Sequence, residues 1–339
     1  MKEDRKRTFG HGSVPALDRD CGDGQGKREF SRLSRWSGEL NICIRCGYCS
    51  ENCPLYRTSG WEIDTPRGRL LLTYGLLSGE VEPSSYVAER LFECFYCKNC
   101  SKSCSAKVSP TDIFTDVRAD LLEAGFEGQG TTVRNDEQMC MACGRCVSAC
   151  KSQALSMDME SLRVVVDRVK CKGCGVCVAE CPVGAMSQKI GFGVSREELS
   201  ARIADSLRSI NGIPKIIVFC CDWSIYPGLR LSRTELTGGN NMSGVIVTVC
   251  AGRIDPGLIL DAFYWGAWGV MIACCPLGEC EHDGNYRAEE RCASVVSLLD
   301  VLGVEPGRLK LEHFASGEAQ KLENAVNSFA GEIAALGPI

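Results

Sequence analysis

Most of the cysteines in this sequence repeat a single spacing. The chain has 339 residues and 24 cysteines, and four segments read C-x2-C-x2-C-x3-C. Thiolate sulfur is a soft ligand that selects zinc, copper and iron–sulfur clusters, so the repeat indicates metal chemistry. The four copies are CIRCGYCSENC (Cys43 to Cys53), CFYCKNCSKSC (Cys94 to Cys104), CMACGRCVSAC (Cys140 to Cys150) and CKGCGVCVAEC (Cys171 to Cys181).

The spacing is typical of 4Fe–4S clusters of the bacterial ferredoxin type. Three cysteines at two-residue intervals let a tight loop hold three corners of one cluster, and the fourth cysteine reaches the neighbouring cluster. The copies are therefore expected to work in pairs that exchange their fourth ligands. The predicted ligand sets are Cys43, Cys46, Cys49 and Cys104; Cys94, Cys97, Cys100 and Cys53; Cys140, Cys143, Cys146 and Cys181; and Cys171, Cys174, Cys177 and Cys150.

Zinc and disulfides are the competing uses of so many cysteines. Structural zinc sites usually combine two separated CxxC pairs or mix cysteine with histidine, which four uninterrupted triplets do not. Disulfide scaffolds are short secreted chains. The charged N-terminus MKEDRKRTFG has no apolar segment behind it, so no secretory signal is expected. These observations favour a metal protein of a reducing, cytoplasmic compartment.

Composition narrows the classes of partner and cofactor. With 45% hydrophobic residues, 24% charged residues and a net charge of −5, the chain has a globular profile that does not favour nucleic acid. Its longest apolar runs, such as GVMIACC, are too short to span a bilayer. No GxGxxG follows a predicted strand and no GxxxxGKS/T is present, so neither a flavin nor a nicotinamide is expected in this chain.

Helices are expected to position the first pair of motifs. Thr65-Pro66 and Ser109-Pro110 each read as an N-cap followed by the first residue of a helix. Between them, SYVAERLFEC predicts a further helix that leads into the second motif.

This first module resembles the C subunit of heterodisulfide reductase and the iron–sulfur subunits of glycolate oxidase. The similarity is carried by CIRCGYCSENCPLYRTSG, TPRGRLLL and LFECFYCKNCSKSC. It implies an α-helical ferredoxin over residues 34–125 that passes electrons and catalyses no reaction itself. Ser105 stands where that family commonly has proline.

The second pair of motifs is expected to form a small α+β ferredoxin of the bacterial two-cluster type over residues 126–190. The short segment between Cys150 and Cys171 suits the β-hairpins of such a domain. Charged residues beside the motifs, such as Lys98, are expected to be solvated or to dock an acidic partner.

Two segments are expected to lie outside the folded modules. The Gly-rich, charged residues 1–33, which include Cys21, read as a flexible tail. Residues 191–212 read as a linker, because Gly212 and Pro214 mark a change of composition.

Strands alternating with helices predict an α/β domain with a parallel sheet over residues 213–339. The apolar runs KIIVFC, GVIVTVC and WGVMIACC, with the weaker RLKLEHF, are the expected strands. Parallel strands share one carboxyl edge, where α/β folds bind ligands. The thiols that fall at this edge therefore predict a metal centre or a dithiol site. They are Cys220, Cys221, Cys250, Cys274 and Cys275, with Cys280 in the following loop.

The same domain resembles the delta subunit of the methyl-viologen-reducing hydrogenase, through VFCCDWSIYPG, VCAGRIDPGLILDAF and GVMIACCPLGEC. The resemblance implies an electron-transfer domain with one 2Fe–2S cluster. Ser224 replaces a further cysteine of that family, and His282 is a candidate ligand or tuning residue. The ligand set implied is Cys221, Cys250, Cys275 and Cys280, which leaves Cys220, Cys274 and Cys292 as core residues.

The motifs and resemblances together predict a non-catalytic iron–sulfur subunit of a cytoplasmic heterodisulfide-reductase-like complex. Its expected cofactors are four 4Fe–4S clusters and one 2Fe–2S cluster. Its expected partners are a heterodisulfide reductase A-like flavoprotein, in which electron bifurcation would occur, and a hydrogenase or other dehydrogenase. The alternative is direct reduction of a disulfide or thiol substrate at the C-terminal cysteines. The CCG motif of heterodisulfide-cleaving subunits is not matched, because the pairs continue as CCDW and CCPL.

Overall fold

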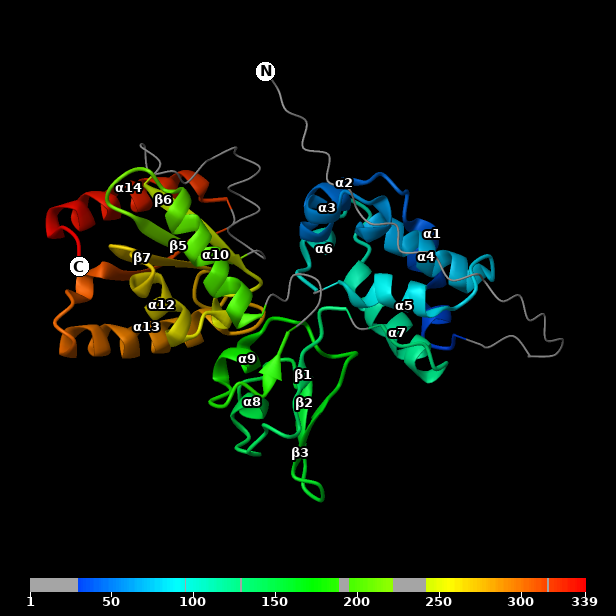
Figure 1. Cartoon of the computed structure of the whole chain (residues 1–339). Coiled ribbons are helices and arrows are strands. Elements are labelled where there is room, and N and C mark those ends of the chain that lie inside the picture. The colour runs from blue at the N-terminus through cyan, green and yellow to red at the C-terminus, as the bar shows by residue number, and fades with distance from the viewer. Residues whose placement is uncertain (1–29, 95, 129, 189–194, 222–241, 316) are drawn as a thin grey trace.

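The chain folds into three lobes that follow one another along the sequence (Figure 1). The computed structural model describes residues 30–339 apart from 95, 129, 189–194, 222–241 and 316, so Cys21 and Ser224 lie outside the described residues. No helix in this described part is long and apolar enough to cross a membrane.

Helices make up the regular structure described in the first lobe. Thr65 caps α4 as predicted, since its hydroxyl accepts a hydrogen bond from the Gly68 backbone N–H at 2.8 Å and Pro66 follows. Ser84 caps α5 in the same way. The helices are α1 (Ser37–Ile42), α2 (Tyr48–Glu51), α3 (Pro54–Ser59), α4 (Pro66–Ser78), α5 (Ser85–Phe92), α6 (Asn99–Lys102) and α7 (Pro110–Glu123), with 3-10 turns at Leu33–Trp36 and Glu62–Asp64.

The first lobe begins before the expected end of the N-terminal tail. Leu33 is fully buried in the helical core, and Phe30 packs against the same core. The backbone N–H groups of Arg32 and Leu33 donate to the Asp120 carboxylate at 3.1 and 2.9 Å. The prediction that residues 1–33 are a tail is therefore wrong for residues 30–33, because an aspartate distant in sequence orders them.

The second lobe combines short strands with short helices, as the sequence predicts. Two antiparallel pairs form, and the β2–β3 pair is the hairpin expected between Cys150 and Cys171. The elements are β1 (Arg134–Asn135), α8 (Arg145–Ser148), β2 (Leu155–Asp158), β3 (Arg163–Val166), α9 (Val176–Glu180) and β4 (Met186–Ser187).

The third lobe is a four-stranded parallel sheet between two layers of helices, which confirms the predicted parallel sheet. The strand order is β6-β5-β7-β8. Helices α10, α12 and α13 cover one face and α14 covers the other. The elements are α10 (Arg196–Ser209), β5 (Ile216–Cys221), β6 (Ser243–Thr248), α12 (Pro256–Tyr264), β7 (Gly269–Cys274), α13 (Gly284–Val301), β8 (Leu309–His313) and α14 (Ala319–Leu336), with 3-10 turns at Ala251–Arg253 and Pro306–Arg308.

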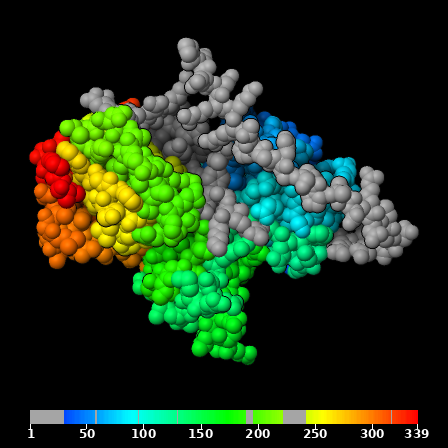
Figure 2. Space-filling view, viewed as in Figure 1, coloured from blue at the N-terminus to red at the C-terminus, as the bar shows by residue number. Residues whose placement is uncertain are grey.

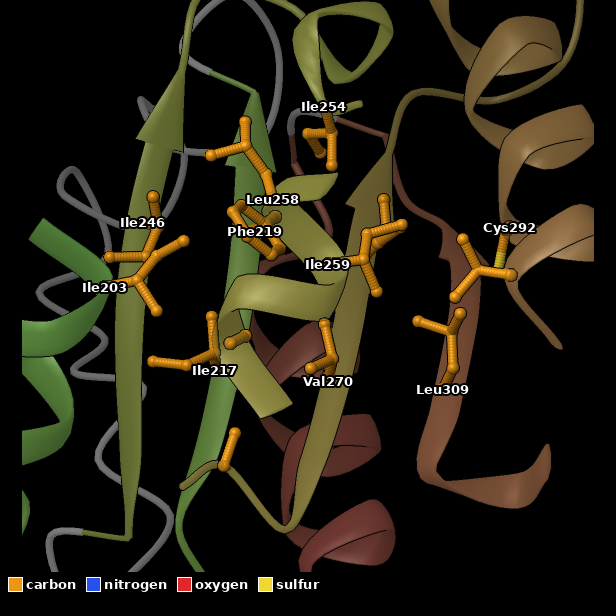
Figure 3. Close-up of a cluster of buried hydrophobic side chains, with 14 of the residues drawn as sticks. Ile203, Ile217, Phe219, Ile246, Ile254, Leu258, Ile259, Val270, Cys292 and Leu309 are labelled. Atoms are coloured by element: carbon orange, nitrogen blue, oxygen red, sulfur yellow. The ribbon is translucent and has the colours of Figure 1, made fainter. Parts of the chain in front are cut away.

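Helix α10 belongs to the third lobe, so the expected linker over residues 191–212 is wrong in its described part. Leu199, Ile203 and Leu207 are buried against the sheet. Figure 3 shows Ile203 beside Ile246 in this core. Each such side chain stabilises the lobe by about 1.5–3 kcal/mol relative to an exposed one. The partner surface of this helix is formed only by the folded sheet, which local composition does not reveal.

The three lobes contact one another in pairs. The Thr131 N–H of the second lobe donates to the Phe92 carbonyl of the first at 3.3 Å. The Arg291 guanidinium of the third lobe bonds the Glu180 carboxylate of the second at 2.5 Å. In the face shown in Figure 2, the green second lobe lies beneath the other two.

Candidate metal centres

Each cysteine motif turns sharply into a short helix directly after its second cysteine. The residue at that turn has a left-handed backbone, with φ of 87° at Gly47, 71° at Gly144 and 77° at Gly175. Glycine adopts this conformation without steric cost. In the second motif the same position is Lys98, with φ of 59°. The turn bends each motif back on itself, so its first three cysteines surround one space.

Two cavities in the first lobe are lined by the cysteines of the predicted sets. Each cavity takes its fourth cysteine from the other motif, as predicted. Cys100 also borders the second cavity, so the two sets adjoin. The first cavity is lined by Cys53, Cys94, Cys97 and Cys100, and the second by Cys43, Cys46, Cys49 and Cys104.

The second lobe repeats this exchange of fourth cysteines. One cavity is lined by Cys140, Cys143, Cys146 and Cys181. In the other set, burial and then the neighbouring thiols of Cys174, Cys171 and Cys150 raise the pKa of Cys177. The charge of a bound metal reverses this effect, because a coordinating thiol is deprotonated outright. Four converging thiols in each of four places fit a 4Fe–4S cluster.

The four cysteines expected to hold a 2Fe–2S cluster lie together at the carboxyl edge of the sheet. Cys221 ends β5, Cys250 follows β6, Cys275 follows β7, and Cys280 stands in the next loop. Their exposed fractions are 2%, 3%, 7% and 6%. The Cys250 and Cys280 sulfurs are 4.0 Å apart, and the Cys275 thiol contacts those of Cys221 and Cys280. This donor set fits a metal or cluster with thiolate ligands.

Hydrogen bonds between these thiols separate their acidities. Bonds from Cys250 and then Cys275 lower the pKa of Cys280. Bonds with Cys221 and then Cys280 raise the pKa of Cys275. These thiols are therefore in direct contact with one another, and the thiolate is the form that binds a metal.

His282 lies beside this set, as the sequence suggested. Its ligand atom and the sulfurs of Cys250 and Cys280 lie within 4.8 Å of one another, and its side chain is buried. Burial lowers the pKa of His282, which favours the neutral imidazole that can bind a metal or a cluster.

The remaining cysteines of this lobe lie in apolar clusters, as predicted. Cys220 is fully buried on the face covered by α14. Cys274 is buried on the opposite face, where its sulfur is 3.4 Å from His313 Nδ1. Cys292 packs from α13 into the core drawn in Figure 3.

The structure adds contacts between the lobes that the sequence did not suggest. Cys174 of the second lobe packs against the sulfur cluster of Cys250, Cys275 and Cys280. Lys98 of the first lobe pairs with Glu281 at 3.0 Å. These two residues are 183 positions apart, so no local pattern links them. Lys98, which was expected to be solvated or to dock an acidic partner, is thus partly exposed and pairs with an acidic residue of the same chain.

Comparison with known proteins identifies the C-terminal part of the chain. Residues 216–337 match the model of the methyl-viologen-reducing hydrogenase delta subunit. The chain is also 37% identical over 129 residues to the vhc iron–sulfur D subunit of the F420-non-reducing hydrogenase of Methanococcus voltae, which covers 38% of this chain and 90% of that protein. The chain belongs to the hydrogenase delta subunit family. The predicted resemblance is confirmed.

Other relatives extend over the cluster-binding lobes. Residues 39–108 and 139–185 each match a model of the 4Fe–4S dicluster domain. The A subunit of the ferredoxin/F420H2-dependent CoB-CoM heterodisulfide reductase of Methanosarcina acetivorans is 32% identical over 205 residues, covering 60% of this chain and 25% of that protein. The glycolate oxidase iron–sulfur subunit of Escherichia coli is 33% identical over 96 residues, covering 28% of this chain and 23% of that protein. This member of the delta subunit family thus carries two 4Fe–4S dicluster domains before its parallel-sheet domain.

Proposed function

We propose that the chain is an iron–sulfur electron-transfer subunit that holds four 4Fe–4S clusters and one 2Fe–2S cluster. The observation that carries the proposal is the gathering of twenty cysteines into five sets of four, in three lobes that touch one another. Clusters of these types supply one-electron transfer when bound. The first lobe is proposed to be the helical type of ferredoxin, and the second the bacterial type.

The residues around the sets suit electron transfer better than direct attack on a substrate. A thiol that exchanges with a disulfide must be accessible as a thiolate. The C-terminal cysteines are at most 7% exposed, which disfavours the alternative of disulfide reduction at that site. Cys46 and Cys143 are exposed. We name the sets to which they belong the outer sets, and the other two sets of the dicluster lobes the inner sets. The outer sets are Cys43, Cys46, Cys49 and Cys104, and Cys140, Cys143, Cys146 and Cys181. These outer sets are the proposed places where a redox partner approaches.

The proposed setting is a cytoplasmic complex related to heterodisulfide reductase. Its support is the likeness to the A subunit of a heterodisulfide reductase and to the D subunit of a hydrogenase. The proposed partners are a flavin-containing subunit similar to the A subunit of heterodisulfide reductase, and a hydrogenase or other dehydrogenase. Flavin-based electron bifurcation is proposed to take place in that flavin partner.

Replacing Cys221 and its neighbour in the full chain tests the C-terminal centre. We expect Cys221→Ser to remove the 2Fe–2S EPR signal of the dithionite-reduced protein and to leave the 4Fe–4S signals. Cys220→Ser is the matched control, because both cysteines are buried in one cluster but only Cys221 makes a hydrogen bond with Cys275. Wild-type protein should contain about 18 iron atoms per chain. A 2Fe–2S signal that survives Cys221→Ser and disappears in Cys220→Ser would overturn the ligand assignment.

A further inference from the structure

Two lysines, one from each dicluster lobe, contact the loop that carries Cys280. We name residues Cys280–Asp283 the clamped loop. Lys98 Nζ of the first lobe donates to Glu281 Oε2 at 3.0 Å. Lys151 Nζ of the second lobe donates to the Cys280 carbonyl at 3.3 Å and pairs with the Asp283 carboxylate. The loop is thus held from two lobes at once.

Lys98 stands at a position where the repeat otherwise uses glycine. The other three motifs have Gly47, Gly144 and Gly175 there, and all four residues are left-handed. In this conformation a Cβ atom crowds the following carbonyl oxygen, so any side chain other than glycine is strained. The second motif therefore keeps a lysine at a position whose backbone favours glycine. Such a local conflict is expected where a residue has a role beyond its own turn.

Lys151 directly follows the fourth cysteine of its motif. The residue at this position varies among the copies: the first and last have Pro54 and Pro182, and the second has Ser105. Proline at that position helps to turn the chain away from the cysteines. Lys98 and Lys151, from two different motifs, thus reach the same loop.

Sulfur and apolar contacts bring the same three parts together. Cys174 of the second lobe packs against Cys250, Cys275 and Cys280. Val249, which precedes Cys250, forms a small buried cluster with Cys53 and Leu55 of the first lobe, against which Tyr56 and Cys97 pack. The C-terminal site therefore adjoins the inner cysteine set of each dicluster lobe.

We propose that Lys98 and Lys151 are positioning residues that dock the clamped loop, and with it Cys280, onto both dicluster lobes. The C-terminal site is then a junction of the two lobes, and each inner cysteine set has its own contact with it. The proposal rests on the proposed function in one respect, that Cys280 is a ligand of the C-terminal centre.

The clamp sets position more than it adds stability. The side chains of Lys98 and Glu281 are 40% and 35% exposed, and those of Lys151 and Asp283 are each 46% exposed. Ion pairs as exposed as these contribute little to the free energy of folding. Buried packing holds the lobes together, and the two lysines determine where the loop lies between them.

Amide hydrogen exchange of the full-length protein tests the clamp at Lys98. We expect Lys98→Gly to speed exchange of the clamped loop by up to about fivefold, the most that an exposed pair contributes. Exchange of α6 should stay unchanged or slow down, because glycine relieves the backbone at this turn. Lys107→Gly is the matched control. Lys107 has the same backbone strain, with φ of 56°, and is exposed in the same lobe. Its replacement should leave the clamped loop unchanged.

Variants that change the net charge near the clamped loop in opposite directions distinguish loss of the Lys98–Glu281 pair from an effect of net charge alone. Lys98→Gly removes a positive charge and Glu281→Gln removes a negative one, but both break the same pair. The clamp predicts faster loop exchange in both variants, no further increase in the double variant, and rescue by Lys98→Arg. Lys151→Gln should likewise free the loop from the second lobe. The EPR line shape of the C-terminal centre should change in each clamp variant and not in Lys107→Gly.

The outcomes distinguish this proposal from the proposed function. Loop exchange that is unaffected by Lys98→Gly, Glu281→Gln and Lys151→Gln would overturn the clamp, even in a protein with a normal 2Fe–2S signal. A protein without that signal would overturn the proposed C-terminal centre, while loop exchange would still report the docking by the two lysines.

Discussion

The ion pair between Glu180 and Arg291 provides a sharp test of how the second and third lobes pack. Arg291 Nη2 donates to Glu180 Oε1 at 2.5 Å, and their side chains are only 10% and 11% exposed. Arg291 Nη1 also donates to the carbonyls of Gly252 and Ile254, at 2.8 and 3.0 Å. Glu180→Gln removes the charge and keeps the shape.

The size of the effect follows from these contacts. Breaking a buried pair by removing one partner costs about 3–5 kcal/mol. The amide oxygen of the new glutamine would still accept a hydrogen bond, and Arg291 would keep its two carbonyl partners. The free energy lost is therefore only that of a charge-assisted hydrogen bond. We therefore expect about 2 kcal/mol less stabilisation of the contact between the two lobes.

The pH dependence of this contact has a definite sign. Burial works to raise the pKa of Glu180, but the hydrogen bond and charge of Arg291, together with the charges of Arg287 and Arg145, outweigh it, so the pKa is lowered overall. The stabilisation is thus present above the ordinary glutamate value, near 4.3, and is lost as the pH falls through the lower folded value. Wild-type docking should weaken over that acidic range.

Native-state amide exchange of α9 and α13 is the appropriate assay, because a protein of three lobes does not unfold in one step. A loss of about 2 kcal/mol speeds exchange roughly thirtyfold. Glu198→Gln is the control, since Glu198 pairs with Arg202 at 2.7 Å but both side chains are more than half exposed. It should change exchange little. Equal exchange in both variants would show that the two lobes do not pack through this pair.

Two further predictions test the lobes individually. Ile203→Ala should cost about 3 kcal/mol and lower the melting temperature of the third lobe by roughly 8 °C, because Ile203 of α10 is fully buried. Arg202→Ala is the control at an exposed position of the same helix. Equal melting temperatures of the two variants would show that α10 does not pack into the third lobe. Arg118→Met should destabilise the first lobe by about 3 kcal/mol, since buried Arg118 donates to the carbonyls of Leu91 and Cys94. Iron analysis should then show loss from that lobe first, and full retention would contradict this role.

Local patterns in the sequence predicted the elements and the cysteine sets. The N-cap at Thr65 and the β2–β3 hairpin follow from short-range chemistry, because the residues that make the hydrogen bonds are close in sequence. The cysteine spacing likewise predicted which motifs exchange their fourth cysteines, and the structure brings those cysteines together. That each set holds a cluster stays a prediction, which iron analysis and EPR would check.

The sequence alone failed where the partner of a residue lies far away along the chain. Residues 30–33 resembled a tail because Asp120, which orders them, is 87 or more positions distant. The described part of the expected linker is a helix because the sheet of the third lobe provides a surface for Leu199 and Ile203. In both cases the local composition was ambiguous, and burial decided the outcome.

The sequence by itself predicted which cysteines of the repeated motifs come together, since their spacing is a property of short segments. Tertiary structure alone decided how those sets meet. Cys174 reaches the C-terminal thiols, and Lys98 reaches Glu281, across separations that only the packing of three lobes closes. The physical reason is that long-range ion pairs and sulfur contacts depend on the relative positions of the folded lobes, and the local periodicity of the sequence does not encode these positions.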